Sequence, residues 1–388
     1  MTLPTARRRR GPLDSRARRV ARLSGRLRTG LIGAVVTAAA AGLSAGELRE
    51  LRALAARALV ELDAPGLSAA VVRGDRLLWA GGFGLADVEN RVPARADTVY
   101  RIASLSKPIT ATAVLQLAER GLVDLDAPVQ RWVPAFPEKR APVSLRQILT
   151  HTSGIRHYRS GEFIQRRRYR DVVAALAIFK DDPLLFEPGT RYGYSSHAYN
   201  LLAAVVECAS GLGFGEYLRE RVFEPAGMND THLDRAERLV DRRARQYERS
   251  GVPGRWRNAP AADLSSKWAA GGMLASVLDL ARFHVALDRG VLLRPESLDL
   301  MHAEHRLDDG TPTGYGLGWA VARDARERLL VGHAGGTTGG SAFLLRVPGT
   351  GEAVALLVNV SDAGDLYPLA QRLLAAARGE AVPEPAED

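Results

Sequence analysis

The stretch Ser104-Leu105-Ser106-Lys107 opens a helical run, I-T-A-T-A-V-L-Q-L-A-E-R-G (109–121), that ends at a glycine. In a helix, residues three apart lie on one face, so the Ser104 hydroxyl and the Lys107 amine are expected side by side. A serine hydroxyl is a weak nucleophile until a base takes its proton, and a lysine whose charge is disfavoured can do so. The stretch therefore predicts a catalytic pair, Ser104 and Lys107, facing a cleft.

Lysine is scarce in this chain, which makes the pair hard to explain by composition. There are 49 arginines but only four lysines, Lys107, Lys139, Lys180 and Lys267. Arginine keeps its proton at working pH, whereas lysine can release it. Chance would give about 0.2 Ser-x-x-Lys pairs. The structural alternative is that Ser104 caps a helix whose first turn carries a solvated lysine.

A second polar cluster, Tyr194-Ser195-Ser196, follows F-E-P-G-T-R-Y-G (186–193) and precedes an apolar helical run. A phenol can act as a base if cationic neighbours lower its pKa, and Lys107 is a candidate for such a neighbour. Ser196 can donate to a bound carbonyl. Alternatively, Tyr194 only stands at the entrance of a helix that a serine caps.

A third stretch, His333-Ala334-Gly335-Gly336, ends the strand-like run L-L-V-G (329–332). Glycines let a substrate approach an edge strand, whose unpaired N–H groups can bind a carbonyl or an oxyanion. Gly335 and Gly336 are therefore predicted to bind substrate, and His333 to add a donor or a cation. Taken alone, a histidine in such a run is usually structural.

Helix-like and strand-like patterns alternate along the chain in a way that predicts the fold. Apolar residues at helical spacing fill 46–63, and two apolar runs parted by Gly74-Asp75 predict a β-hairpin. The middle, roughly 104–300, is helical in character. Strand-like runs return at 315–323, 329–336, 341–349 and 352–360, before a helical run at 365–378. Strands at both ends predict an α+β fold in which the termini share one sheet, with a helical insertion and a cleft between them.

The N-terminal segment carries the excess positive charge. Residues 1–28 hold ten arginines and one aspartate, which accounts for the formal net charge of +9, so a nucleic-acid partner is not expected. The uncharged stretch 31–43 has signal-peptide length and is short for a membrane span. We expect residues 1–45 to be a signal or anchor segment and the protein to be exported, periplasmic or extracellular. A retained membrane anchor, an organelle transit peptide and a disordered basic tail are the alternatives.

Other kinds of site find little support. The single cysteine, Cys208, permits no intramolecular disulfide, and its apolar helical surroundings predict a core residue. His302 and His305 lack H-E-x-x-H spacing, so neither a metal nor another cofactor is expected. The G-x-S-x-G run at 42–46 lacks the strand-to-helix context of a nucleophile elbow.

The order Ser-x-x-Lys (104–107), Tyr-x-Ser (194–196), His-x-Gly (333–335) resembles the serine β-lactamase and penicillin-binding-protein superfamily, in its class C-like branch. The stretches 148–155, 186–195 and 267–276 are also similar to it, and the resemblance covers about residues 66–362. Within that branch, V-P-A-F-P-E-K-R, H-T-S-G-I-R-H-Y and D-D-P-L-L-F-E-P-G-T resemble the mitochondrial serine β-lactamase-like members, which are of peptidase type.

The resemblance implies a hydrolase domain over 46–380 with an antiparallel sheet. An α/β lobe would comprise about 46–103 and 301–380, and a helical lobe about 104–300. It also implies an acyl-enzyme on Ser104, with Lys107 and Tyr194 handling the proton. The N–H groups of Ser104 and Gly336 would form the oxyanion hole, and His333 would contact the substrate.

Two departures from the family pattern narrow the expected substrate. Ser196 stands where asparagine is usual, and His333 stands where β-lactamases have lysine. We therefore predict a peptidase, carboxypeptidase or esterase acting on a peptide or small-molecule substrate. The alternatives are a β-lactamase that hydrolyses β-lactam antibiotics and a penicillin-binding sensor or scaffold that does not turn over. The oligomeric state stays open.

Overall fold

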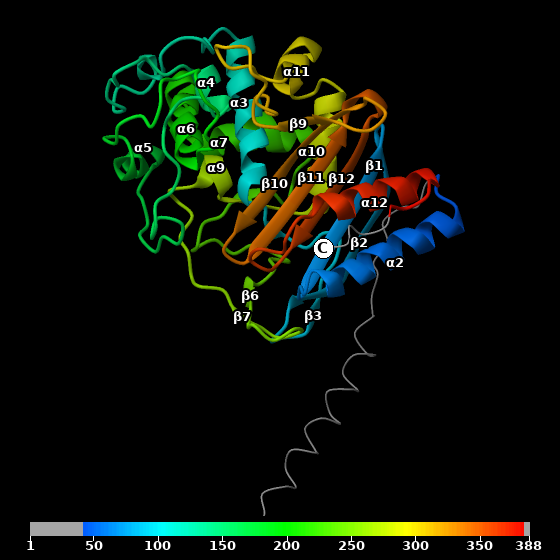
Figure 1. The fold of residues 1–388 in the computed structure, drawn as a ribbon. Helices are drawn as coiled ribbons and strands as arrows, with labels where there is room; N and C mark the ends of the chain where they lie inside the picture. The colour runs from blue at the N-terminus through cyan, green and yellow to red at the C-terminus, as the bar shows by residue number, and fades with distance from the viewer. Residues whose placement is uncertain (1–41, 384–388) are drawn as a thin grey trace, which may run out of the picture.

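A seven-stranded antiparallel sheet runs through the computed structural model, which describes residues 42–383 (Figure 1). Its strands are β3 (Val92–Pro93), β2 (Arg76–Asp87), β1 (Gly66–Arg73), β12 (Glu352–Val358), β11 (Gly340–Val347), β10 (Leu329–Thr337) and β9 (Ala320–Arg323), in that spatial order. In the centre β1 pairs with β12, so that Leu67 lies opposite Val358. The predicted α+β fold, with one sheet built from both chain ends, is confirmed.

Both faces of the sheet are buried, which explains why its strands read as continuous apolar runs. Successive side chains of a strand point to opposite faces. In β1, Ala69 and Val71 join the apolar cluster beneath α2 (Ala45–Glu61) and α12 (Tyr367–Arg378), whereas Ala70 and Val72 join the larger cluster on the helical side. Figure 1 shows α2 and α12 side by side over the outer face.

The helical side is built around α3 (Ser106–Glu119), whose side chains are almost all buried. It contacts α6 (Ser196–Ser210) and α9 (Trp268–Gly271), while α10 (Val277–Asp288) packs against β1 and β12. The remaining helices are α4 (Leu145–Leu149), α5 (Val172–Ala175), α7 (Phe214–Leu218), α8 (Glu224–Ala226) and α11 (Pro295–His302). Because α10 lies within 104–300 yet packs on the sheet, the predicted division into two lobes stays a prediction.

Several short elements had no counterpart in the sequence pattern. Strands of two or three residues show no alternation to detect. They are β4 (Tyr100–Arg101), β8 (Met273–Ala275) and β5 (His232–Leu233) in one small sheet, and β6 (Tyr247–Arg249) with β7 (Trp256–Asn258) in another. The short helical turns are η1 (Ala103–Leu105), η2 (Val129–Arg131), η3 (Leu176–Ile178), η4 (Arg219–Phe223) and η5 (Pro348–Thr350).

Two expectations about single segments are wrong. The run 315–323 is a strand only in its last four residues, because Gly318 adopts φ of +89° where it meets α3, and a Cβ there would lie 2.8 Å from the Cβ of Ala111. Cys208 is exposed rather than buried, since it lies in the last turns of α6, beyond the buried stretch that ends at Val206.

The predicted signal or anchor segment, residues 1–45, falls almost wholly outside the described residues. Ser44, the serine of the G-x-S-x-G run, is the N-cap of α2 and accepts a hydrogen bond from the Glu47 N–H. Among residues 42–383, no single helix has the length and apolar composition of a membrane span. One bent pair, Ser196–Ser210 with Phe214–Ala226, meets both criteria together.

Candidate active site

Ser104 lies in the η1 turn between β4 and α3, on a strained stretch of backbone. The preceding residue, Ala103, has φ of +47°, a left-handed conformation that costs energy for any residue with a side chain. Two contacts hold the turn: the Ser106 hydroxyl donates to the Ala103 carbonyl at 2.7 Å, and β10 packs against it through Gly335. Strain of this kind is typical of functional sites.

Lys107 is fully buried, and its amine has three polar neighbours. Nζ lies 3.0 Å from Ser104 Oγ, 3.1 Å from Ser196 Oγ and 2.8 Å from the carbonyl oxygen of Ala270. Burial, aided by the charge of Lys267, holds the pKa of Lys107 well below its ordinary value. A neutral amine has two N–H donors and one lone pair. It can therefore donate to Ala270 and Ser196 and accept the proton of Ser104.

Tyr194 lies beside this amine, with its ring centroid 4.7 Å from Lys107 Nζ. Burial raises the pKa of Tyr194, and the nearby hydroxyls of Ser104 and Ser196 oppose that rise only in part. The prediction that Lys107 lowers this pKa is therefore wrong, because a neutral amine cannot stabilise a phenolate in a desolvated site. Tyr194 is a neutral phenol, able to donate a hydrogen bond.

Two histidines hold the start of α6 and so position this tyrosine. The N–H of Ser195 donates to Nδ1 of His151 at 3.1 Å, and the N–H of Ser196 donates to Nδ1 of His157 at 3.1 Å. The His151 ring also packs on the Tyr194 ring at a centroid distance of 4.2 Å. These two N–H groups belong to the first turn of a helix, which has no partners for them of its own.

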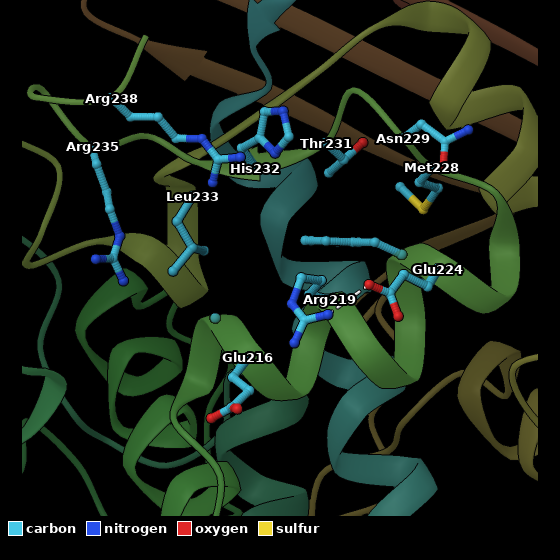
Figure 2. A pocket seen from close by; sticks show the side chains of 12 residues that line it. Glu216, Arg219, Glu224, Met228, Asn229, Thr231, His232, Leu233, Arg235 and Arg238 are labelled. Carbon is cyan, nitrogen blue, oxygen red and sulfur yellow. Dashed lines mark hydrogen bonds and ion pairs between the residues drawn. The ribbon is translucent and has the colours of Figure 1, made fainter. Parts of the chain in front are cut away.

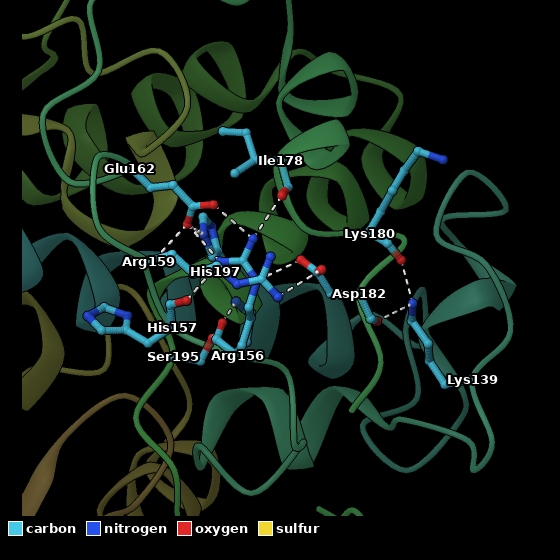
Figure 3. Close-up of polar contacts among 11 residues, drawn as sticks. Lys139, Arg156, His157, Arg159, Glu162, Ile178, Lys180, Asp182, Ser195 and His197 are labelled. Atoms are coloured by element: carbon cyan, nitrogen blue, oxygen red, sulfur yellow. Dashed lines mark hydrogen bonds and ion pairs between the residues drawn. The ribbon is translucent and has the colours of Figure 1, made fainter. Parts of the chain in front are cut away.

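A buried ion-pair network, drawn in Figure 3, anchors the segment that carries His157. The Arg156 guanidinium binds Glu162 at 2.6 Å and Asp182 at 2.6 Å. It also donates to the carbonyl oxygens of His157 at 3.0 Å and Ile178 at 2.9 Å. Arg159 also binds Asp182 at 3.0 Å, so two guanidinium groups balance two carboxylates, and the network fixes the backbone at His157.

His333 does not carry the charge expected of it. Burial lowers the pKa of His333 to about 3, so the ring is neutral near pH 7. Its Nδ1–H donates to the Ala334 carbonyl at 2.6 Å, which leaves Nε2 to accept from the Tyr315 hydroxyl at 2.9 Å. The cation alternative for His333 is therefore wrong. Both ring nitrogens are already engaged.

The edge of β10 is free where the glycines lie. Its partner β9 pairs only with Leu329–Gly332, so within the described part of the chain β10 has no ladder partner on that side from His333 onward. A Cβ on Gly335 would lie 2.5 Å from the Ile102 carbonyl oxygen and 3.1 Å from the Ser104 nitrogen, whereas a Cβ on Gly336 would meet nothing within 4 Å. Gly335 therefore allows β10 to approach Ser104, and Gly336 faces open space.

These elements enclose a cavity of about 160 Å³. Four predicted site residues, Ser104, Tyr194, Ser196 and Gly336, line it, and Lys107, Gly335 and His333 are not among its lining residues. The sequence did not predict the other lining residues: His157, Tyr158, Phe163, Lys267, Ala270, Gly271 and Thr337. Among residues 42–383, no carboxylate lines the cavity. The one feature of the sequence that could have pointed to Lys267 is the scarcity of lysine, since the chain has only four.

Lys267 supplies the positive charge that was expected at His333. Its amine lies 4.7 Å from the centroid of the Tyr158 ring and 4.4 Å from that of Phe163, and it donates to the Phe163 carbonyl. Burial, together with Arg101, lowers the pKa of Lys267 to about 8. The ammonium form therefore still predominates at pH 7.

A larger hollow elsewhere lacks this chemistry. It measures about 570 Å³ and is lined by residues of α7, η4, α8 and β5. Figure 2 shows Arg219 paired with Glu224 at its wall, and Arg235 and Arg238 across from them. None of the predicted site residues lies there. In the part of the chain that the structure describes, no three His, Cys, Asp or Glu side chains gather as a metal site requires.

Alanine substitutions at Gly335 and Gly336 test the close approach of β10 to Ser104. Gly335→Ala is expected to lower the free energy of unfolding by about 1–3 kcal/mol and to reduce hydrolysis, because the added methyl group pushes β10 away from Ser104. Gly336→Ala is expected to leave stability unchanged. Thermal melts and ester hydrolysis of both variants check this. Equal melting temperatures for the two variants would contradict the close approach at Gly335.

Residues 51–378 match the family model described as Beta-lactamase. The chain is 29% identical to the serine β-lactamase-like protein LACTB, mitochondrial, of Homo sapiens, over 78% of this chain and 75% of that protein. It is 37% identical to esterase EstB of Burkholderia gladioli over 47% of this chain and 50% of that one. The crystal structure of D-amino acid amidase from Ochrobactrum anthropi SV3 superposes with a TM-score of 0.74 at 26% identity, covering 86% of this chain and 99% of that one.

Proposed function

Because this chain belongs to the β-lactamase family and is a serine hydrolase, we propose that it forms its acyl-enzyme on Ser104, with neutral Lys107 as the base. The main support for this proposal is the set of three hydrogen-bond contacts that Lys107 Nζ makes. A buried amine with one carbonyl acceptor and two hydroxyl neighbours can take the Ser104 proton without first losing its own.

In the acylation step, Ser104 Oγ bonds to the substrate carbonyl carbon while its proton passes to Lys107. Backbone N–H groups of Ser104 and Gly336 stabilise the negative charge on the carbonyl oxygen. When the bond to the leaving group breaks, the proton is delivered to the leaving atom. Tyr194, a neutral phenol at the cavity wall, is suited to relay that proton. Water then attacks the acyl-enzyme by the reverse proton transfers, and Ser104 is restored.

Peptides and esters are the proposed substrates. The relatives named above include an esterase and an amidase. Ser196 lacks the amide that asparagine would offer, and its hydroxyl is taken up by Lys107 at 3.1 Å. His333 is neutral and engaged, so the cation that a β-lactam carboxylate would meet in the cavity is Lys267, whose amine already donates to the Phe163 carbonyl. A β-lactamase is therefore the second candidate.

For location, we propose export or membrane anchoring through residues 1–45, with an organelle as the alternative. The arginine-rich segment and the apolar stretch 31–43 support the first. The mitochondrial relative supports the second. Sequencing the N-terminus of protein purified from its host distinguishes a cleaved segment from a retained one.

Intact-protein mass spectrometry over time tests the proposed function. The protein is mixed with a fluorophosphonate, a p-nitrophenyl ester and nitrocefin in turn. We expect one stable phosphonyl adduct on the peptide that contains Ser104, and a transient acyl adduct with the ester that disappears as nitrophenol is released. An acyl adduct that persists without turnover would instead indicate a sensor. Nitrocefin turnover with kcat/KM near about 10⁴ M⁻¹s⁻¹ would indicate a β-lactamase.

A further inference from the structure

The contacts of His157 fix which of its nitrogens carries the proton. Nδ1 lies 3.1 Å from the backbone nitrogen of Ser196, and a backbone N–H can only donate. Nδ1 must therefore accept, and the proton of the neutral ring lies on Nε2. Partial burial, with the charge of Lys267, lowers the pKa of His157 to about 4, so the neutral ring predominates at pH 7.

His157 is held in place from three sides. Arg156 donates to its carbonyl oxygen at 3.0 Å, Ser196 donates to its ring, and the Tyr158 ring packs on it at a centroid distance of 4.5 Å. In Figure 3 its ring points away from the ion-pair network around Arg156. His157 lines the cavity, and within residues 42–383 its Nε2 has no hydrogen-bond partner. A positioned donor is thus left for a ligand.

The ring that carries this donor contacts Ser196, which stands where the family pattern has asparagine, and both residues line the cavity. Ser196 is too short to reach far into the cavity, and Lys107 occupies its hydroxyl. The group expected to accept a hydrogen bond from this uncharged N–H is an uncharged oxygen. In a peptide-like acyl donor, the acceptor nearest to the scissile carbonyl is the carbonyl oxygen of the preceding amide.

We propose that His157 determines acyl specificity by donating from Nε2 to a second carbonyl of the substrate, so that the enzyme prefers acylaminoacyl or peptidyl donors to simple alkanoyl ones. This rests on the proposed function. His157 does not act as a base in this proposal, because a base at Nε2 would need the tautomer that Ser196 excludes.

Three p-nitrophenyl esters of equal chain length test the proposal. The N-acetylglycinate has an amide carbonyl, the 4-oxopentanoate has a ketone at the same place, and the pentanoate has neither. Rates are corrected with the Ser104→Ala variant. We expect wild-type kcat/KM to be about tenfold higher for the two carbonyl-bearing esters than for the pentanoate, in line with one well-placed hydrogen bond.

Two variants of His157 test the Nε2 donor and the Nδ1 contact with Ser196 independently. In His157→Gln the amide nitrogen takes the place of Nε2, so the donor remains and the acceptor for Ser196 is lost. In His157→Asn the amide oxygen takes the place of Nδ1, so the Ser196 contact remains and the donor is lost. We expect the Gln variant to retain most of the preference for carbonyl-bearing esters and the Asn variant to lose it, the preference being the ratio of kcat/KM to that for the pentanoate measured with the same variant.

The outcomes are distinguishable. If the pentanoate is hydrolysed in a Ser104-dependent way but the wild type shows no preference among the esters, the inference about His157 is wrong and the proposed function stands. The inference is equally wrong if the Asn variant keeps the preference. If none of the esters is hydrolysed above the Ser104→Ala rate, the proposed function itself fails.

Discussion

Ser104→Ala is expected to lower kcat/KM for a p-nitrophenyl ester by about 10⁴-fold, because within residues 42–383 no other hydroxyl near Lys107 is placed to attack in its stead. Ser196 is the other hydroxyl in contact with this amine, and it lies at the start of α6, whereas Ser104 lies beside the free edge of β10. The variant should also fail to form the phosphonyl adduct. Stopped-flow hydrolysis and intact mass measure both effects.

Ser106→Ala is the matched control, since it lies two residues away in the same stretch. Its hydroxyl donates to the Ala103 carbonyl and does not touch Lys107. Loss of that single hydrogen bond should cost about 1 kcal/mol of stability and less than about tenfold in kcat/KM. If Ser104→Ala retained more activity than Ser106→Ala, the nucleophile would have to be another residue.

Lys107→Arg is expected to lower kcat/KM by about 10³-fold or more, although it keeps a long basic side chain. A guanidinium keeps its proton and cannot accept that of Ser104. Lys107→Met should cause a similar loss and leave the melting temperature unchanged or higher, since it removes a polar group from a site with no counter-charge. Lys180→Met, at a partly exposed lysine paired with Asp181, should match the wild type. Activity of Lys107→Arg near the wild-type level would exclude the amine as the base.

The pH dependence of hydrolysis is expected to follow the protonation state of Lys107. Since the neutral amine is the active form, kcat/KM should rise with pH through the pKa of Lys107, which lies well below 10.5. Lys267→Met removes a nearby positive charge, so protonated Lys107 becomes less unfavourable and its pKa rises. The rising limb should then move to higher pH. A limb that does not move would show that Lys267 has no influence on the base.

Periodicity in the sequence was enough to predict the fold. The hairpin around Gly74-Asp75 and the strands after residue 328 all have long apolar runs, and the structure confirms them as β1–β2 and β10–β12. The predicted strand 315–323 is wrong before Ala320, because the close packing of Gly318 on α3 is a tertiary contact. Periodicity carries no information about such contacts.

Less of the active site than of the fold could be predicted from the sequence. Ser104 and Lys107 share one helical turn, so spacing alone predicted their contact. The protonation of Tyr194 and of His333 depends on burial by distant segments, and both expectations about charge were wrong. His157 meets Ser196 across a loop of irregular backbone, where spacing predicts nothing about direction.

The pairing of β1 with β12 bears on how the chain folds. Leu67 meets Val358 only after nearly the whole described chain has been made, and β10 reaches Ser104 from the same late segment. Contacts between residues so far apart in sequence are costly in loop entropy and form slowly. A nascent or C-terminally truncated chain would thus carry Ser104 without β10, the strand that we propose binds the oxyanion. Hydrolytic activity would appear only in the last stage of folding.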